Sequence, residues 1–494
     1  MKYFLSTFVI SSLILIGRLS GLFREVSLAN VLGNSVNADI AIALFTLPDI
    51  FTAFFLGGGF SLVIVPLVSQ KGDAFFKSIL FFFVKRALFV LSFIALITFV
   101  FRYYFFSFLA PGVNIYLYDF FDLGFLLVCI SIVLAGLSSL FSSFLGSKES
   151  FFTSYLGTFI FNISIIASLY FLINSNILMS ISYGVFFGAT IRLFIQILNF
   201  FFLKIETIHE EEFFLVKGFY SKFFSAVIFV STLAILPIIS RSFASGFGEG
   251  MLAMFHYSLR IVELPVTFLI VPILIAIFPS MSVFFSSATE EEKVSFVSLV
   301  LRVSLIFSIL ICIPLYFFSE EVIRTVYFLA NFDESSFKKI GDIFKWSSLT
   351  IPALSIISVL QYLISSNSKT SFLLLPSIYV LISHIISSFI SRELFGFEGV
   401  LISYIATYYI LSFLMLFFTI KIHKINFFKL LSKIYLGVIP VVICIIFSKT
   451  AREAEIDIFY ALIFGFLSFL ISGLVYVFID NELKRKLFFS RNSI

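Results

Sequence analysis

The sequence predicts an all-α polytopic membrane protein, and three observations lead to that prediction. Of its 494 residues, 60% are hydrophobic and only 12% are charged, whereas a soluble domain carries about 25% charged residues. The mean hydropathy is +1.13. Apolar segments recur along the whole chain, and each is long enough to cross a hydrocarbon layer about 30 Å thick as a helix. We therefore expect a bundle of transmembrane helices that functions within the membrane.

Polar breaks between the apolar segments divide the chain into about 14 predicted transmembrane helices. In chain order they cover residues 3–30, 38–69, 77–105, 119–147, 151–174, 179–203, 218–242, 250–284, 294–318, 340–366, 370–391, 397–420, 430–448 and 457–479. The segment 320–342 is too polar to cross a membrane, so we expect an interfacial helix followed by a turn there.

The distribution of Lys and Arg predicts the orientation, and a faint internal repeat predicts the organisation. If both termini are cytoplasmic, the cytoplasmic connections hold roughly twice as many basic residues as the opposite side. The segment 47–70, which begins LPDIFTAFF, resembles the segment 264–284, which begins LPVTFLIVP, and this predicts two pseudo-symmetric six-helix lobes, a plan typical of transporters. The predicted parts are an N-terminal lobe (1–203), a cytoplasmic linker (204–217), a C-terminal lobe (218–420), and two extra helices with a basic tail (421–494).

Basic residues predominate among the charges that fall within the predicted spans. An arginine at a bilayer centre costs about 2.5–3.5 kcal/mol on insertion scales, so such residues normally face a cavity or a partner. Guanidinium groups bind phosphate oxygens bidentately, which favours an anionic substrate such as a diphosphate. Alternatively, the arginines pair structurally with acids such as Glu25. The candidate substrate-binding residues are Arg18, Arg24, Asp39, Arg192, Arg241, Arg260 and Glu263.

The first two candidate arginines belong to GRLSGLFRE at 17–25, directly behind the first apolar run. Six residues separate Arg18 from Arg24, which is about 120° around a regular helix, so the two would point in different directions. Gly17 and Gly21 permit either a bend or a close contact with another helix. We therefore expect this helix to be shaped by its surroundings.

No catalytic or metal-binding pattern occurs in the sequence. It contains no HExxH, GxSxG or P-loop, and its three cysteines lie far apart within apolar segments. We accordingly expect no enzyme, no cofactor, no metal and no nucleic-acid partner. His256 and His384 are candidate protonation sites, although a histidine within a helix is more often a hydrogen-bonded packing residue.

Residues 11–70 resemble the N-terminal signature of the MurJ/MviN family of bacterial lipid II flippases, within the multidrug/oligosaccharidyl-lipid/polysaccharide exporter superfamily. The matching elements are R-x-x-G-x-x-R-E at 18–25, Asp39, Leu-Pro at 47–48, G-x-F-S at 58–61 and V-P at 65–66. The second half agrees in SRSFASGFGEGMLAMFHYSLRIVELP at 240–265. Further agreement is found at Asn162, in G-x-x-x-G at 184–188 and in LANF at 329–332.

The resemblance implies a function, a location and partners. The family carries lipid II, an undecaprenyl-diphosphate-linked disaccharide-pentapeptide, from the inner to the outer leaflet of the bacterial cytoplasmic (inner) membrane. The resemblance implies alternating access, with Arg18, Arg24 and Arg260 as cavity arginines and Asp39 as the family's acid. The expected partners are lipid II and membrane lipids, with the cell-wall synthesis machinery as a further candidate. We expect a monomer, with the polyprenyl tail held by the last two helices.

The sequence also departs from the family pattern. Thr52 lies where a basic residue is usual and Gly57 where a glutamate is usual, while Arg192 could restore the missing positive charge. Spans 218–242 and 370–391 contain no Asp or Glu, so the membrane potential is a better candidate drive than the sodium site of some members. The alternatives are an exporter of another lipid-linked oligosaccharide, a multidrug exporter, a membrane-embedded transferase and a non-transporting scaffold.

Overall fold

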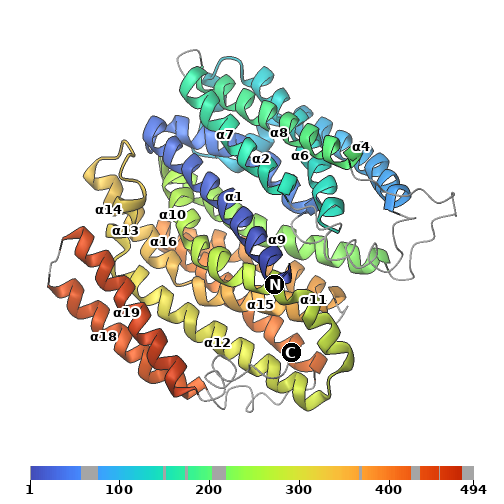
Figure 1. The fold of residues 1–494 in the computed structure, drawn as a ribbon. Coiled ribbons are helices and arrows are strands. Elements are labelled where there is room, and N and C mark those ends of the chain that lie inside the picture. The colour runs from blue at the N-terminus through green and yellow to red at the C-terminus, as the bar shows by residue number, and fades with distance from the viewer. Residues whose placement is uncertain are drawn as a thin grey trace. The chain divides into compact units, whose positions relative to one another are not determined.

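The computed structural model describes residues 2–56, 76–147, 152–172, 176–202, 219–366, 370–423, 434–454 and 457–480. Within these ranges all regular elements are helices (Figure 1). Ten of the described helices are long and apolar enough to cross a membrane, or up to eleven if one bent pair is a single span. The all-α polytopic fold is therefore confirmed. Each predicted span contains a helix, whereas the predicted linker at 204–217 lies outside the described residues.

The chain divides into two compact units. The first unit comprises Met1–His256, Leu329–Phe332 and Thr370–Val400. Its helices are α1 (Lys2–Leu32), α2 (Val36–Leu56), α4 (Phe76–Val100), α5 (Arg102–Leu109), η2 (Ile115–Leu117), α6 (Phe121–Ser147), α7 (Phe152–Leu172), α8 (Ile177–Phe202), α9 (Phe219–Ser245), the first part of α10 (Met251–Pro265), η4 (Thr370–Leu373) and the first part of α16 (Leu374–His423).

The second unit comprises Tyr257–Phe328, Asp333–Lys369 and Leu401–Ile494. Besides the remaining parts of α10 and α16, its helices are η3 (Val266–Ile270), α11 (Val271–Ser287), α12 (Glu290–Phe317), α13 (Ser319–Val326), α14 (Glu334–Ser348), α15 (Ile351–Ser366), η5 (Ile434–Gly437), α18 (Val438–Glu453) and α19 (Ile458–Ile479). Within this unit α12 packs against α15, α18 and α19.

Helices α7 and α8 of the first unit approach each other closely through the G-x-x-x-G of 184–188. A Cβ atom on Gly184 would lie 2.9 Å from the Cα atom of Ile165, and one on Gly188 would lie 3.1 Å from the Cα atom of Phe161. Small residues allow such close backbone packing between transmembrane helices. These glycines therefore set the distance between α7 and α8.

We expect Gly184→Ala to destabilise the protein by about 1–3 kcal/mol, the usual cost of overpacking, because the backbone of α7 must move. The measurement is the thermal unfolding of the purified chain in detergent. Gly17→Ala in α1 is the matched control, because a Cβ atom there would lie 3.9 Å from Thr158 of α7, which is an ordinary contact. Equal unfolding temperatures for the two variants would contradict this prediction.

Helix α1 runs without interruption from Lys2 to Leu32. Gly17 lies against Thr158 and Tyr155 of α7, and Gly21 lies against Asn162 of the same helix. Of the two roles expected for these glycines, close contact with a neighbouring helix is therefore the one observed.

Two features of the helices were not revealed by the sequence. The span predicted at 250–284 consists of α10, the π-helical turn η3 and α11. The spans predicted at 370–391 and 397–420 are joined in α16, with non-helical backbone angles at Gly396. The positive φ of +60° there favours glycine. The change of backbone direction between these two predicted spans therefore depends on Gly396 and needs no separate loop.

The polar segment predicted at 320–342 forms a short helix, a turn and the start of a longer helix. Arg324 of α13 hydrogen-bonds Glu320 at 2.8 Å and also pairs with Glu334 of α14. Asp333 caps α14 by accepting a hydrogen bond from the backbone N–H of Ser336 at 3.0 Å. Hydrogen bonds from Ser336 and Ser335 hold the pKa of Asp333 below its usual range. The helix and turn expected in this segment are present.

A buried ion pair connects the last helix to the rest of the second unit. Arg302 Nη2 of α12 lies 2.9 Å from Asp480 Oδ2, directly after α19, and Tyr476 donates to the same oxygen at 3.2 Å. Ile306 and Leu310 pack against Cys444 and Tyr476 in the adjacent apolar cluster. Arg302, one of the arginines that fall within the predicted spans, therefore has a structural partner.

Candidate functional site

Four ionisable side chains from three helices meet in the interior of the first unit. They are Arg24 and Glu25 of α1, Arg241 of α9 and His256 of α10, and we call them the Arg24 cluster. Arg24 Nη2 donates to Glu25 Oε1 at 2.7 Å, and His256 Nε2 lies 2.9 Å from Glu25 Oε2. Arg241 Nη1 hydrogen-bonds His256 Nδ1. All four side chains are buried, the most exposed being Arg241 at 9%.

Arg24 is also held on its other sides. Its Nη1 donates to Asn162 Oδ1 of α7 at 3.2 Å, and Asn162 Nδ2 donates to Ser20 Oγ at 2.9 Å. The ring of Phe45 on α2 lies 4.3 Å from Arg24 Cζ, within the range of a cation–π contact. Neutral, aromatic and anionic groups therefore together compensate for burying this guanidinium group.

Asp39 stabilises the start of α10. Its Oδ2 accepts a hydrogen bond from Gly250 N at 2.9 Å, and its Oδ1 accepts one from Ala253 N at 2.8 Å. The first N–H groups of a helix lack partners within the helix and carry a partial positive charge, so a buried carboxylate suits this position. Asp39 therefore acts on the backbone of α10.

The structure places Arg18 and Arg192 differently from Arg24. Arg18 is exposed, and it lies within electrostatic range of Tyr155 on α7. Arg192 of α8 is partly buried, with Asp49 of α2 within electrostatic range. The Nε of Arg192 is buried without a hydrogen-bond partner among the described residues. A Cβ atom on Gly157 would lie 2.7 Å from Arg192 Cγ, so glycine makes room for this arginine.

Arg260 and Glu263 belong to the second unit and lie on the part of α10 that follows His256. Arg260 Nη1 is 3.5 Å from Glu263 Oε2, and about one third of each side chain is exposed (32% and 33%). A long, partly exposed ion pair of this kind contributes only about 0–1 kcal/mol in water. The Arg260–Glu263 contact is therefore weak by itself.

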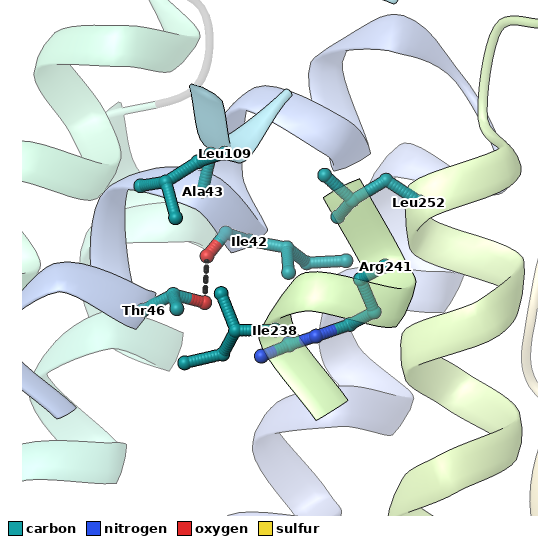
Figure 2. A pocket seen from close by; sticks show the side chains of 7 residues that line it. All are labelled: Ile42, Ala43, Thr46, Leu109, Ile238, Arg241 and Leu252. Atoms are coloured by element: carbon teal, nitrogen blue, oxygen red, sulfur yellow. Dashed lines mark hydrogen bonds between the residues drawn. The ribbon is translucent and has the colours of Figure 1, made fainter. Parts of the chain in front are cut away.

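A small cavity adjoins Arg241 within the first unit. Its volume is about 10 Å³, enough for roughly one water molecule. Figure 2 shows the residues that line it, which are Ile42, Ala43, Thr46, Leu109, Ile238, Arg241 and Leu252. Thr46 Oγ1 donates to the carbonyl of Ile42 at 2.6 Å, so Arg241 provides the only charged side chain among these lining residues.

In the described parts of the chain, no group of three or more His, Cys, Asp or Glu side chains could hold a metal ion. Cys129, Cys312 and Cys444 are buried free thiols. The polar chemistry of the described core therefore comes mainly from guanidinium, carboxylate, imidazole and hydroxyl groups.

Comparison with protein-family models identifies the family of this chain. The family model described as "Lipid II flippase MurJ" matches residues 28–470. The chain belongs to the lipid II flippase MurJ family. The family resemblance predicted from GRLSGLFRE and the segments around it is thereby confirmed.

Curated relatives of this MurJ-family chain carry the name "Probable lipid II flippase MurJ". The protein from Buchnera aphidicola subsp. Schizaphis graminum is 25% identical over 331 residues, which are 65% of this chain and 64% of that protein. The Treponema pallidum protein is 25% identical over 72% of this chain and 70% of its own length. The protein from Buchnera aphidicola subsp. Acyrthosiphon pisum is 24% identical and aligns over 98% of both chains.

Solved structures show the same fold. A structure titled "Lipid II flippase MurJ, inward closed conformation" matches with a TM-score of 0.75 and 19% identity, covering 95% of this chain and 99% of its own. A multidrug resistance MATE family transporter of the MOP superfamily, in an inward-facing conformation, matches with a TM-score of 0.60 and 12% identity, covering 84% and 98%. At these identities the likeness concerns the fold alone.

The MurJ-family resemblance and the geometry agree in part. Arg24, Asp39 and Asn162 are buried in the first unit, and Arg24 and Asn162 are in contact. The motifs at 58–61 and 65–66, like Gly57, lie outside the described residues.

Sequence reasoning did not place Glu25 and His256 among the site residues, although both bind the arginines of the Arg24 cluster. Glu25 directly follows Arg24, and adjacent residues do not normally face each other on a helix. His256 lies 231 residues from Glu25. The sequence offered Glu25 only as an alternative structural partner of the arginines, and His256 only as a candidate protonation site.

Proposed function

We propose that this chain is a lipid II flippase that moves the undecaprenyl-diphosphate-linked peptidoglycan precursor from the inner to the outer leaflet by alternating access. The observation that supports it most is the match of the MurJ family model to residues 28–470. The basic side chains within the helices are consistent with a diphosphate headgroup, because guanidinium groups bind phosphate oxygens strongly.

The arginines differ in how readily they could meet a phosphate. Arg24 is paired with Glu25 in the interior, and separating a buried pair costs about 3–5 kcal/mol. Arg18 is exposed, and about one third of the Arg260 side chain is exposed (32%). We propose that Arg18 and Arg260 make the first phosphate contacts and that Arg24 joins them in another conformation. Asp39 would contribute by holding α10, which carries Arg260.

Arg192 and Arg241 are proposed to support cargo binding indirectly. Arg192 could supply positive charge where the family has a basic residue near position 52, and its Nε, which has no hydrogen-bond partner among the described residues, is a donor that could turn to the cargo. Arg241 contacts His256 and adjoins the small cavity.

The same proposal extends to the tail, the location and the assembly. The apolar tail would lie along α18 and α19, whose exposed side chains include Ile446 and Phe466. The protein would act as a monomer in the cytoplasmic membrane with both termini inside. Two lobes, residues 1–203 and 218–420, would enclose a central cationic cavity that opens in turn to each side of the membrane, and neither an enzyme activity nor a cofactor is proposed.

Complementation tests the proposal. A strain depleted of its own lipid II flippase receives the wild type, Arg18→Ala, Arg24→Ala or Arg260→Ala at matched membrane levels, and growth and lipid II leaflet distribution are measured. One phosphate contact is worth about 1.5–3 kcal/mol, so each loss should weaken cargo binding about 10- to 100-fold. We expect the wild type to restore growth and the three variants to fail.

Arg102→Ala is the control, because this arginine pairs with the exposed Asp122 outside the candidate site. It should complement like the wild type. If Arg18→Ala and Arg260→Ala also complement, the phosphate assignment is wrong. If a well-expressed wild type fails, an exporter of another lipid-linked oligosaccharide becomes the better proposal.

A further inference from the structure

The connection between α4 and α6 in the first unit exposes many apolar side chains. It consists of residues 101–120, which we call the 101–120 segment, and it contains the short helix α5 and the turn η2. The large side chains that it exposes, by 51–78%, are Phe101, Tyr104, Phe108, Tyr116, Leu117 and Phe120. Apolar side chains gathered at a surface in this way indicate contact with another protein or with a membrane.

A different set of apolar side chains holds the 101–120 segment to the first unit. These buried residues, at most 6% exposed, are Phe106, Leu109, Ala110, Val113 and Ile115. The ring of Phe106 packs edge-on against Phe121 of α6, with ring centroids 5.5 Å apart. The segment therefore packs onto the protein with one set of apolar side chains and presents a second set outwards.

Phe120 adopts a backbone conformation that does not suit a phenylalanine. Its φ is +62°, and it is the one residue other than glycine with a positive φ in the described part of the chain. Residues with a bulky side chain rarely occupy this left-handed region, which glycine and asparagine tolerate. The side chain is 62% exposed, so it gains little from packing inside the protein. This combination points to a stabilising contact outside the protein.

The two helices that the 101–120 segment joins place it at a membrane surface. α4 ends at Val100 and α6 begins at Phe121, and the two helices pack against each other. Both are long and apolar enough to cross a membrane, so their common end lies where the hydrocarbon core meets water. Exposed apolar side chains continue along α4 at Phe93 and Leu96. The exposed side of the segment is therefore a continuation of a lipid-facing helix.

The 101–120 segment is also bound to the end of α9. Gly112 N donates a hydrogen bond to Ser245 Oγ at 3.0 Å, and Ser242 Oγ donates one to the carbonyl of Phe108. A Cβ atom on Gly112 would lie 2.1 Å from Ser245 O, so the two backbones are in direct contact. Because α9 follows the linker predicted at 204–217, these contacts join two parts of the chain that are distant in sequence.

We infer that the 101–120 segment is an interfacial anchor, whose exposed side chains bind the headgroup region of the bilayer and whose hydrogen bonds to α9 restrain the end of that helix. The partner is the lipid leaflet, because the segment continues a lipid-facing helix and exposes Tyr104 and Tyr116, whose amphipathic rings suit the membrane–water interface. With both termini inside, as predicted, this is the outer leaflet. The inference does not depend on the cargo or on the proposed function.

Tryptophan fluorescence tests the lipid contact. The chain has one tryptophan, so a Trp346→Phe background allows Phe120→Trp to report on the 101–120 segment alone. The full-length protein is reconstituted into vesicles whose lipids carry bromine either beside the headgroup or near the chain ends, and acrylamide probes access from water. We expect the Phe120→Trp emission to be quenched more strongly by bromine beside the headgroup than by bromine near the chain ends.

Two further positions calibrate the depth. Phe89 lies near the middle of α4 and is 76% exposed, so Phe89→Trp should be quenched more by bromine near the chain ends. Glu291 lies in the acidic first turn of α12, so Glu291→Trp should be quenched by acrylamide alone. If Phe120→Trp behaves like Glu291→Trp, the inference is wrong. Shielding of Phe120→Trp from both lipid and acrylamide would also overturn it, because a protein surface would then cover the segment.

Hydrogen exchange in lipid nanodiscs tests the link to α9. The double variant Leu117→Ser/Phe120→Asn removes two side chains that are 78% and 62% exposed, and asparagine tolerates the positive φ. Losing the burial of one large apolar side chain changes an equilibrium about tenfold or more. We therefore expect amide exchange in residues 242–245 to become about tenfold faster than in the wild type.

Phe93→Ala is the matched control, because Phe93 is also exposed (56%) but belongs to α4 rather than to the 101–120 segment. It should leave exchange in residues 242–245 unchanged. Exchange in the middle of α6 shows whether each variant is folded. Wild-type exchange at 242–245 in a folded double variant would overturn the link to α9. Neither experiment uses lipid II, so failure of this inference and failure of the proposed function are observed separately.

Discussion

Arg24→Gln should abolish flipping and destabilise the protein by about 3–5 kcal/mol, because it leaves the Glu25 carboxylate buried beside a neutral partner. The side chains of Arg24 and Glu25 are 5% and 1% exposed, so water cannot replace the lost ion pair. The measurements are the thermal unfolding of the purified protein and its flipping rate in proteoliposomes.

A double-mutant cycle separates pairing from cargo binding. Glu25→Gln alone leaves the Arg24 charge without its carboxylate partner, whereas the double variant Arg24→Gln/Glu25→Gln removes both charges of the pair and leaves the net charge of the cluster unchanged. Replacing both members of a buried pair is often far less costly than replacing one. We expect the double variant to regain most of the unfolding temperature but not to flip lipid II.

Full recovery of flipping in the double variant would mean that Arg24 acts only as a structural partner of Glu25. Failure of the double variant to regain stability would instead show that other contacts, such as those with Asn162 and Phe45, dominate at this position. The two readouts therefore distinguish a ligand from a structural residue.

Asp39→Ala is expected to destabilise the protein by about 3 kcal/mol, because it leaves the Gly250 and Ala253 amides buried without their acceptor. Asp39→Asn keeps one acceptor oxygen and should cost about 1 kcal/mol. Both are measured by thermal unfolding, followed by the complementation assay.

The control is Asp122→Asn. Asp122 also lies in the first turn of a helix of the first unit, but 55% of its side chain is exposed and it pairs with Arg102. Its replacement should change stability by less than about 1 kcal/mol. If Asp39→Asn folds like the wild type but does not complement, the charge of Asp39 has a role beyond holding α10.

The sequence was a good guide to the helices, because the cost of placing polar groups in a bilayer makes long apolar segments unambiguous. It did not reveal the π-helical turn after Pro265 or the turn at Gly396. These features depend on packing between distant segments, and hydropathy carries no signal of them.

The site was predictable as a set of residue types but not as a set of contacts. An arginine within a transmembrane span normally faces a cavity or a partner, so Arg24 and Arg241 were identified as candidate site residues from the sequence alone. Pairing of an arginine with Glu25 was one of the alternatives, but contacts between distant residues were not predictable: Arg24 and Asn162 are 138 residues apart, and Asp39 and Gly250 are 211 apart. Such pairings are determined by the tertiary fold.

The anchoring of α10 by Asp39 has a mechanical consequence. Two hydrogen bonds clamp its first turn, and Gly250 is wedged against the backbone, since a Cβ atom there would lie 1.6 Å from Asn34 O. Because the first turn of α10 is held in place, its C-terminal end can move only if the helix bends. The most compliant part is Pro265 with the π-helical turn Val266–Ile270, where the regular hydrogen-bond ladder is interrupted. Bending of α10 should therefore be concentrated after Arg260 and Glu263.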